Sequence, residues 1–130
     1  MPAINFLQRY APAILVGTKH QTIRKPRADH RPHATIGAKL FLYTGMRSKS
    51  CKKLFETVCT NTSQIVIDND PYRVIVNGVE VQDEDRFAQA DGFPSVAELF
   101  DFFEETHGLP FHGTLIEWEP PTSVEREKRE

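Results

Sequence analysis

The chain has 130 residues, which is the size of a single domain and too short for two independent hydrophobic cores. Hydrophobic residues make up 39% of it and charged residues 26%, a balance that is typical of a soluble globular protein and argues against a disordered one. No apolar run approaches the roughly 20 residues of a membrane helix, and no signal peptide is evident, so we expect a cytoplasmic protein with no membrane partner.

The small net charge of −2 conceals a strong asymmetry along the chain. Residues 1–53 hold 11 Lys or Arg and one acid, Asp29, a net charge of +10, whereas residues 54–130 hold 5 basic and 17 acidic side chains, a net charge of −12. One interpretation is a basic surface that attracts anions such as nucleotides or RNA. The other is that the two halves interleave in the fold and their charges largely cancel. The sequence leaves both open.

The N-terminal pattern predicts a short helix over residues 8–17. Pro12 suits its first turn, and Gly17 can end it in the left-handed conformation. Residues 20–24 follow as a short extended segment. Residues 25–37, which contain two prolines, are predicted to form a basic loop.

Strands dominate the middle of the chain, where β-branched and aromatic residues partly alternate with polar ones. The dipeptide Asn77-Gly78 is a strong hairpin signal, because both central positions of a type I′ turn need positive φ. The predicted strands are, in chain order, 39–44, 53–60, 64–68, 72–76, 79–81 and 113–118.

Two helices are predicted between the hairpin and the last strand. The first begins near Asp83 and ends at about Ala90. The second begins after Ser95, an N-cap residue with Glu98 three positions on, as in a capping box. Its apolar residues recur at helical spacing, and His107 at its end is interpreted as partly buried rather than as a ligand.

This order of elements describes one α+β domain over residues 1–119, built on a curved or barrel-like sheet. Residues 120–130 are mostly charged and are predicted to form a disordered tail.

Dinucleotide, P-loop and GxSxG motifs are absent. Cys51 and Cys59 lack paired cysteines nearby and are expected to be reduced. His30 and His33 have only Asp29 as a further candidate ligand, whereas a zinc site usually needs three or four ligands, so no metal or cofactor is expected.

The run GTKHQTIR at residues 17–24 concentrates chemically useful side chains. Lys19 could act as a general base if burial or a neighbouring cation such as Arg24 lowered its pKa. Thr22 offers a hydroxyl that such a base could activate as a nucleophile. Positions 19 and 22 of a regular strand face apart, so the pair can cooperate only if the chain turns before the extended segment.

Two runs, INFLQRY at residues 4–10 and ILVGTKHQTIR at 14–24, resemble the start of the ASCH domain, which has a PUA-like fold. The spacing of F-x-Q-R to G-x-K-x-x-T-I-R is similar to that of the small bacterial N4-acetylcytidine amidohydrolases. GAKLFLYTG at 37–45 and AQADGF at 88–93 resemble later segments of the family, so the resemblance covers residues 4–118. It implies a β-barrel with flanking short helices.

The resemblance also implies an activity and a set of site residues. In these amidohydrolases the lysine, here Lys19, activates the threonine, here Thr22, which attacks the acyl carbonyl of an N4-acylated cytosine nucleoside such as N4-acetylcytidine. An acidic residue, which matches Asp91 here but is a glutamate in the family, moves protons to the leaving amine. The expected substrate-binding residues are Phe6, Gln21, Arg24, Tyr43 and Arg47.

Two other functions remain open for the same basic region. The first is an RNA-binding PUA-like module, in which Tyr43 or Phe41 stacks on a base and cationic side chains contact phosphates. The second is a ribonuclease in which Lys19 promotes attack by a ribose 2′-hydroxyl. RNA binding should weaken steeply with salt, whereas hydrolysis of a free nucleoside should not. The cations expected to contact phosphates are Arg24, Arg27, Arg47, Lys49, Lys52 and Lys53.

Overall fold

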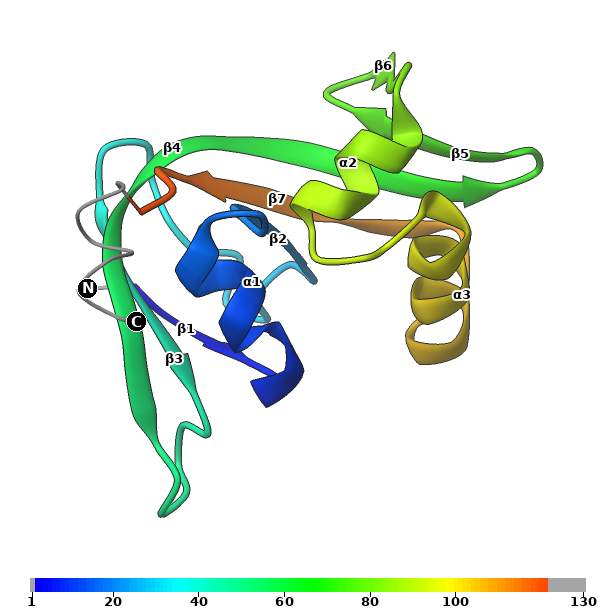
Figure 1. Cartoon of the computed structure of the whole chain (residues 1–130). Helices are drawn as coiled ribbons and strands as arrows, with labels where there is room; N and C mark the ends of the chain where they lie inside the picture. The colour runs from blue at the N-terminus through cyan, green and yellow to red at the C-terminus, as the bar shows by residue number, and fades with distance from the viewer. Residues whose placement is uncertain (1, 122–130) are drawn as a thin grey trace.

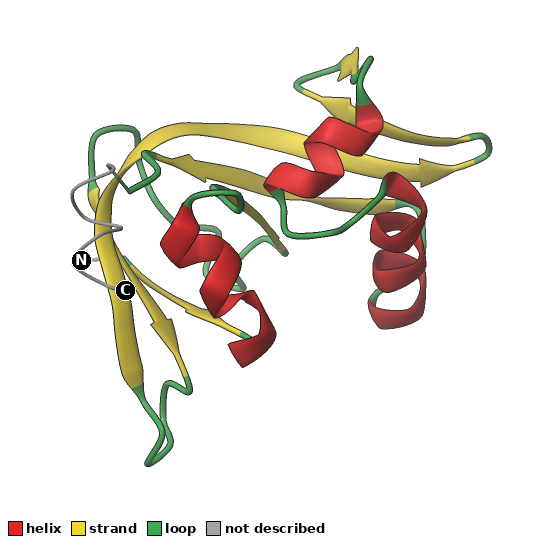
Figure 2. Ribbon diagram, in the orientation of Figure 1, coloured by secondary structure: helices red, strands yellow, loops and turns green. Residues whose placement is uncertain are grey.

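A computed structural model describes residues 2–121 (Figures 1 and 2). Most of the predicted charged tail, residues 122–130, lies outside the described residues. The described part is an α+β structure with one large sheet of seven strands and three short α-helices. Its elements are β1 (Ala3–Phe6), the 3-10 helix η1 (Gln8–Tyr10), α1 (Ala11–Val16), β2 (Gln21–Arg24), β3 (Lys39–Thr44), β4 (Lys52–Asn69), β5 (Tyr72–Val76), β6 (Val79–Glu80), α2 (Glu84–Ala90), α3 (Val96–Thr106) and β7 (Phe111–Trp118).

The sheet branches at β4. Its strands follow the order β1-β3-β4-β5-β6, and β7 pairs with both β4 and β2. The first part of β4 pairs with β3, and the later part pairs with β7 and β5. Within the described chain, β1, β2 and β6 each pair with a single strand, so the sheet is curved but not closed (Figure 1). The α+β class is confirmed, and the strand pairing shows an open sheet.

The long strand β4 corrects the prediction of two separate strands at 53–60 and 64–68. The polar residues 61–63 suggested a break, but they continue the strand and pair with β7. The register opposite β7 shifts between Cys59 and Asn61, and a bulge of this kind bends a strand without ending it. Local polarity therefore marked the bend of β4 rather than its end.

The N-terminal region contains a strand that the sequence did not predict. β1 pairs in parallel with β3, and Ile4 and Phe6 point into the core. The predicted helix over 8–17 is divided into η1 and α1, and Gly17 ends it with φ of 92°, in the left-handed region as expected. A four-residue strand whose partner lies more than 30 residues away carries little local signal.

The two later helices lie where they were predicted, but α3 begins differently. Asp83 caps α2, because its carboxylate accepts a hydrogen bond from the backbone N–H of Arg86 at 3.1 Å. Ser95 is the N-cap residue of α3 as predicted, but its side chain makes no capping hydrogen bond, so only the capping box is wrong. Instead the backbone N–H of Val96 donates to Asp85 Oδ1 at 2.9 Å, which ties the start of α3 to α2.

The predicted hairpin turn is also confirmed. Asn77 and Gly78 have φ of 48° and 81° between β5 and β6. Cys51 and Cys59 are both free, as expected. None of the helices in the described region has the length and apolar character needed to cross a membrane.

The buried residues form two hydrophobic clusters that meet at the β2–β7 pair. The first joins α1, β1, β3 and the first half of β4, and includes Trp118. The second joins α2, α3, β5 and the second half of β4, and includes Ile23. The segment that connects α1 to β2 passes between the two clusters and carries Lys19.

Candidate functional site

The turn between α1 and β2 determines the direction of Lys19. After Gly17, the backbone N–H of Lys19 donates to the carbonyl of Ala13 at 3.1 Å, and that of His20 donates to the carbonyl of Ala90 at 3.0 Å. Lys19 therefore precedes β2 instead of belonging to it, so the strand alternation that would separate it from Thr22 does not apply. The chain turns at the place where cooperation of the two residues requires it.

The three predicted catalytic residues line one cavity, which we call the site cavity. It has a volume of about 420 Å³ and lies among β1, η1, β2, the end of α2 and α3. Lys19, Thr22 and Asp91 all line it, although Asp91 is about 70 residues away from the other two along the chain. Each of the three side chains is at most 5% exposed.

The side chain of Lys19 is buried among two carbonyl acceptors and two aromatic rings. Its Nζ donates to the carbonyl of Gln21 at 2.8 Å and to the carbonyl of Asp91. The rings of Tyr10 and Phe6 lie 5.0 and 5.4 Å from Nζ, measured to their centroids. Burial lowers the pKa of the amine, the charge of Asp91 opposes that shift, and the charge of Arg24 adds to it. A lysine with a lowered pKa can serve as a general base.

Asp91 is the acid of the site. It caps the C-terminus of α2, and its Oδ1 accepts a hydrogen bond from Gln21 Nε2 at 3.3 Å. Complete burial raises the pKa of its carboxyl to about 6, although the charge of Lys19 and the bond from Gln21 act in the opposite direction. A carboxyl that titrates near neutrality can carry a proton to a leaving group.

Thr22 receives a hydrogen bond from a cation. Arg24 Nε donates to Thr22 Oγ1 at 3.2 Å, and Arg24 Nη2 donates to the carbonyl of Asn5 at 2.7 Å. The guanidinium also lies 5.0 Å from the centroid of the Phe6 ring. Because the arginine donates to the hydroxyl oxygen, it would stabilise an alkoxide formed at Thr22.

The predicted substrate-binding residues divide into two groups. Phe6 and Arg24 line the site cavity. Gln21 does not, because its side chain is buried and donates to Asp91 and to the carbonyl of Phe87, so it positions the acid. Tyr43 on β3 and Arg47 in the β3–β4 hairpin also lie outside the residues that line the cavity. The hairpin projects away from α2 and α3 (Figure 1).

The sequence analysis missed an aromatic wall along the cavity, made of Tyr10, Phe93, Phe102 and Phe103. Neighbouring rings lie 6.3 Å apart from Tyr10 to Phe93, 5.5 Å from Phe93 to Phe102 and 5.3 Å from Phe102 to Phe103. The helical spacing of α3 suggested only a core face. The available signal was Phe102, which adds a fourth aromatic or apolar position beyond the buried stripe at 99, 100 and 103.

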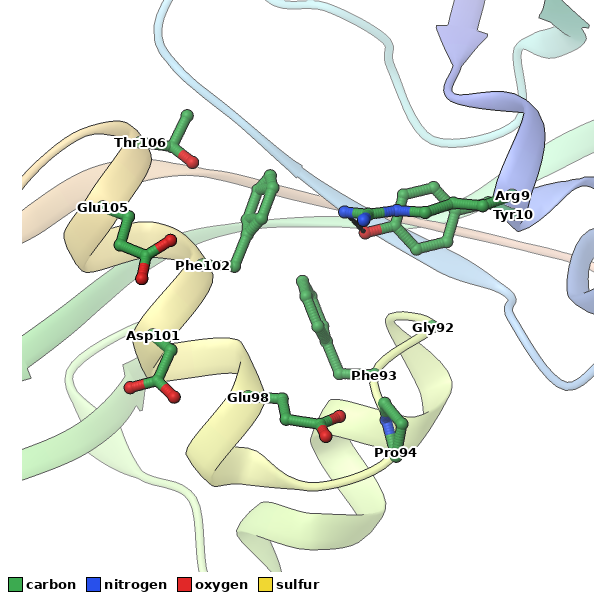
Figure 3. A pocket seen from close by; sticks show the side chains of 10 residues that line it. All are labelled: Arg9, Tyr10, Gly92, Phe93, Pro94, Glu98, Asp101, Phe102, Glu105 and Thr106. Atoms are coloured by element: carbon green, nitrogen blue, oxygen red, sulfur yellow. Dashed lines mark hydrogen bonds between the residues drawn. The ribbon is translucent and has the colours of Figure 1, made fainter.

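A second cavity of about 610 Å³, which we call the acidic cavity, adjoins the first and shares Tyr10, Phe93 and Phe102 with it (Figure 3). Arg9 lies on one side, with its guanidinium 5.0 Å from the Tyr10 ring centroid. No lysine lines it, and its one hydroxyl beside Tyr10 is that of Thr106, so it lacks the buried lysine and strand threonine of the site cavity. Its acidic residues, all from α3, are Glu98, Asp101 and Glu105.

Comparisons with known proteins add no relative: no family model matches the chain, and no curated protein or solved structure matches it significantly. Within residues 2–121, no three His, Cys, Asp or Glu side chains are grouped closely enough to hold a metal ion. The functional interpretation therefore depends on the geometry of the site cavity and on the N-terminal motif.

Proposed function

We propose that this chain is an ASCH-type amidohydrolase with a PUA-like fold that removes the acyl group from N4-acylated cytosine nucleosides such as N4-acetylcytidine. The observation that carries the proposal is the meeting of a buried lysine, a threonine hydroxyl and a buried acid in one cavity. The volume of about 420 Å³ is within the range of small-molecule sites. The curved sheet with short helices supports the PUA-like part of the proposal.

In the first half of the reaction, neutral Lys19 takes the proton of the Thr22 hydroxyl, and Thr22 Oγ1 attacks the acyl carbonyl carbon. Arg24 stabilises the developing charge on Oγ1 through the hydrogen bond that it already makes. The bond from the carbonyl carbon to N4 then breaks. Asp91 gives its proton to N4, so cytidine leaves as the neutral amine and the acyl group remains on Thr22 as an ester.

In the second half, water attacks the ester carbonyl and loses a proton to Asp91. The bond to Oγ1 breaks, and the proton held by Lys19 returns to Thr22. The products are a carboxylic acid and the regenerated site, so atoms and protons balance without a metal. The aromatic wall offers ring faces against which a planar cytosine can stack.

The test is hydrolysis of N4-acetylcytidine, followed by the absorbance change to cytidine in the presence of EDTA. Thr22→Val keeps the shape of the side chain but removes the nucleophile, and should lower kcat/KM by on the order of 10³-fold or more. Thr22→Ser keeps a hydroxyl and should retain measurable turnover. Lys19→Arg keeps the positive charge but supplies no base near neutral pH, and should be as damaged as Thr22→Val.

Thr44→Val is the matched control, because Thr44 is also a buried strand threonine but lies outside the site cavity. It should turn over substrate at close to the wild-type rate. Wild-type turnover by Thr22→Val would overturn the assignment of the nucleophile. Absence of turnover by the wild-type protein would overturn the proposed function.

A further inference from the structure

A row of aromatic rings connects the two ends of the site cavity. At one end Tyr10 covers Lys19. The aromatic wall then leads away from the catalytic residues to Phe103, whose centroid lies 5.8 Å from that of His107. At this far end Lys25, His33 and His107 line the cavity and form what we call the basic mouth.

The members of the basic mouth lie close to one another. His33 Nε2 donates to the carbonyl of Lys25 at 2.6 Å, which holds these two residues together. The charge of Lys25 contributes to a lowered pKa of His107, after the larger effect of burial, which places the two side chains near each other. Lys25 itself is exposed, and none of the ion pairs among residues 2–121 includes it.

Arg24 lies between the two ends of the cavity, because it donates to Thr22 and directly precedes Lys25 in the chain. Its Nε and Nη2 are each committed to one protein acceptor, Thr22 and Asn5, and a guanidinium has five N–H groups. The remaining N–H groups are free for a ligand beside Lys25. Asp91 is the only acid that lines the site cavity, and it lies at the catalytic end.

The neighbouring acidic cavity is lined by three acidic side chains, in contrast to the basic mouth. Glu98, Asp101 and Glu105 line it together with Phe93 and Phe102, the two rings that also line the site cavity (Figure 3). An anionic group is repelled from that side and attracted to the basic mouth, so the two cavities together orient a charged substrate. With the acyl group at Thr22 and the base along the aromatic wall, the ribose side of the substrate faces the mouth.

We propose that the preferred substrate is a mononucleotide, an N4-acylated cytidine that carries a phosphate on its ribose, and that Lys25 is the main determinant of this preference. Arg24 supplements it. The inference depends on the proposed function, because it names the substrate class of the same cavity. Phosphate recognition by a lysine beside an arginine is a common charge-assisted arrangement.

The experiment compares kcat/KM for N4-acetylcytidine 5′-monophosphate and for N4-acetylcytidine at low ionic strength. The wild-type protein should prefer the nucleotide by about 10-fold or more, the effect of one charge-assisted hydrogen bond at a partly exposed site. In Lys25→Gln this ratio should fall to about 2 or less, since the amide cannot pair with the phosphate charge. Lys39→Gln, which changes an exposed lysine of β3 outside the cavity, should keep the wild-type ratio.

Equal efficiency on nucleoside and nucleotide would overturn this inference and leave the amidohydrolase proposal standing. A still higher efficiency on an oligonucleotide with an internal N4-acetylcytidine would overturn the assignment of a mononucleotide. If the wild-type protein hydrolyses neither small substrate, the proposed function fails, and calorimetric binding of cytidine 5′-monophosphate against cytidine tests the mouth separately. Binding of both with the same affinity would then overturn the role of Lys25.

Discussion

Lys19 and Asp91 show how burial can create reactivity from ordinary side chains. Desolvation disfavours the charge on each, which lowers the pKa of the amine and raises the pKa of the carboxyl to about 6. Their mutual attraction opposes both shifts. Because the ammonium donates to the backbone carbonyl of Asp91, the carboxylate is left to Gln21. The pKa of each group is therefore shifted toward neutrality, the direction that the proposed acid–base catalysis requires.

The raised pKa of Asp91 has a consequence for folding. The folded state holds its proton up to about pH 6, whereas the unfolded chain releases it near 3.8, so this contribution to stability is present below pH 4 and is lost as pH rises through 6. Asp91→Asn removes that loss and retains an acceptor for Gln21. At 1.36 kcal/mol per pKa unit, the free energy of unfolding of Asp91→Asn should gain on the order of 2–3 kcal/mol over wild type between pH 4 and pH 7.

Urea unfolding of both proteins at several pH values measures this difference. If the difference in the free energy of unfolding between the two proteins stayed constant across that range, Asp91 would have the same pKa in the folded and unfolded states, which would contradict the prediction. The same variant should lose most hydrolytic activity, because an amide cannot pass a proton to the leaving amine.

At this scale the sequence motif was sufficient for Lys19 and Thr22 but not for their surroundings. The motif predicted two residues that line the same cavity, the proposed base and nucleophile, and a helix-ending Asp91 was recognisable before a glycine. Gln21 was expected to touch substrate, but its buried amide is held by Asp91 and by the carbonyl of Phe87 in α2. Contacts between segments 70 residues apart are not encoded in local spacing.

At the scale of elements, the site forms because the end of α2 lies next to the turn before β2. Gly92 has φ of 99°, and a Cβ there would lie 3.0 Å from Lys19 Cδ and 3.0 Å from the Tyr10 ring. The glycine therefore lets the chain leave α2 in the left-handed region and also leaves room for the buried lysine. A larger residue would push Lys19 and Tyr10 by a few tenths of an ångström.

Gly92→Ala tests this arrangement against Gly37→Ala. Gly37 has a similar φ of 88° but open space around it, so both variants should lose about 1–2 kcal/mol of stability from left-handed strain. Only Gly92→Ala displaces Lys19, so its kcat/KM should fall by roughly 10-fold or more, as small misplacements of catalytic groups do. Equal activity of the two variants, each measured well below its unfolding transition, would contradict the role assigned to Gly92.

Elements with strong local signals were predictable, and those defined by partners were not. The Asn77-Gly78 turn and α2 followed from turn and capping chemistry. β1 and the continuity of β4 depend on pairing with distant strands, and the start of α3 is stabilised by Asp85 instead of the expected Ser95. Tertiary contacts decided each of these cases.

At the scale of the whole molecule, the charge asymmetry of the chain is only partly cancelled in the fold. Arg27 pairs with Asp29 at 3.0 Å, and Lys53 pairs with Glu56, both at about half-exposed positions. The residues of the basic mouth and the acidic residues of α3 line different cavities. The fold therefore gathers positive charge where the proposed substrate enters, without requiring a continuous basic face for RNA.

Salt dependence separates these two uses of charge. Hydrolysis of the uncharged nucleoside N4-acetylcytidine should change less than about twofold between 50 and 200 mM NaCl. Binding of an RNA through 6–10 phosphate contacts would weaken by about 10³–10⁵-fold over the same range. A steep loss of nucleoside hydrolysis, parallel to salt-sensitive RNA binding, would favour the RNA-directed alternative.

The most direct test of the account is whether Thr22 becomes acylated during turnover. Wild-type protein mixed with excess N4-acetylcytidine, quenched in acid and digested, should yield the peptide that contains Thr22 carrying an acetyl ester, and Thr22→Val should yield none. With hydroxylamine present, the ratio of acetohydroxamate to acetate should be the same for N4-acetylcytidine and N4-acetylcytosine, because both would pass through the same acyl-enzyme. Undiminished turnover by Thr22→Val, with no acetylated peptide from wild type, would contradict the account.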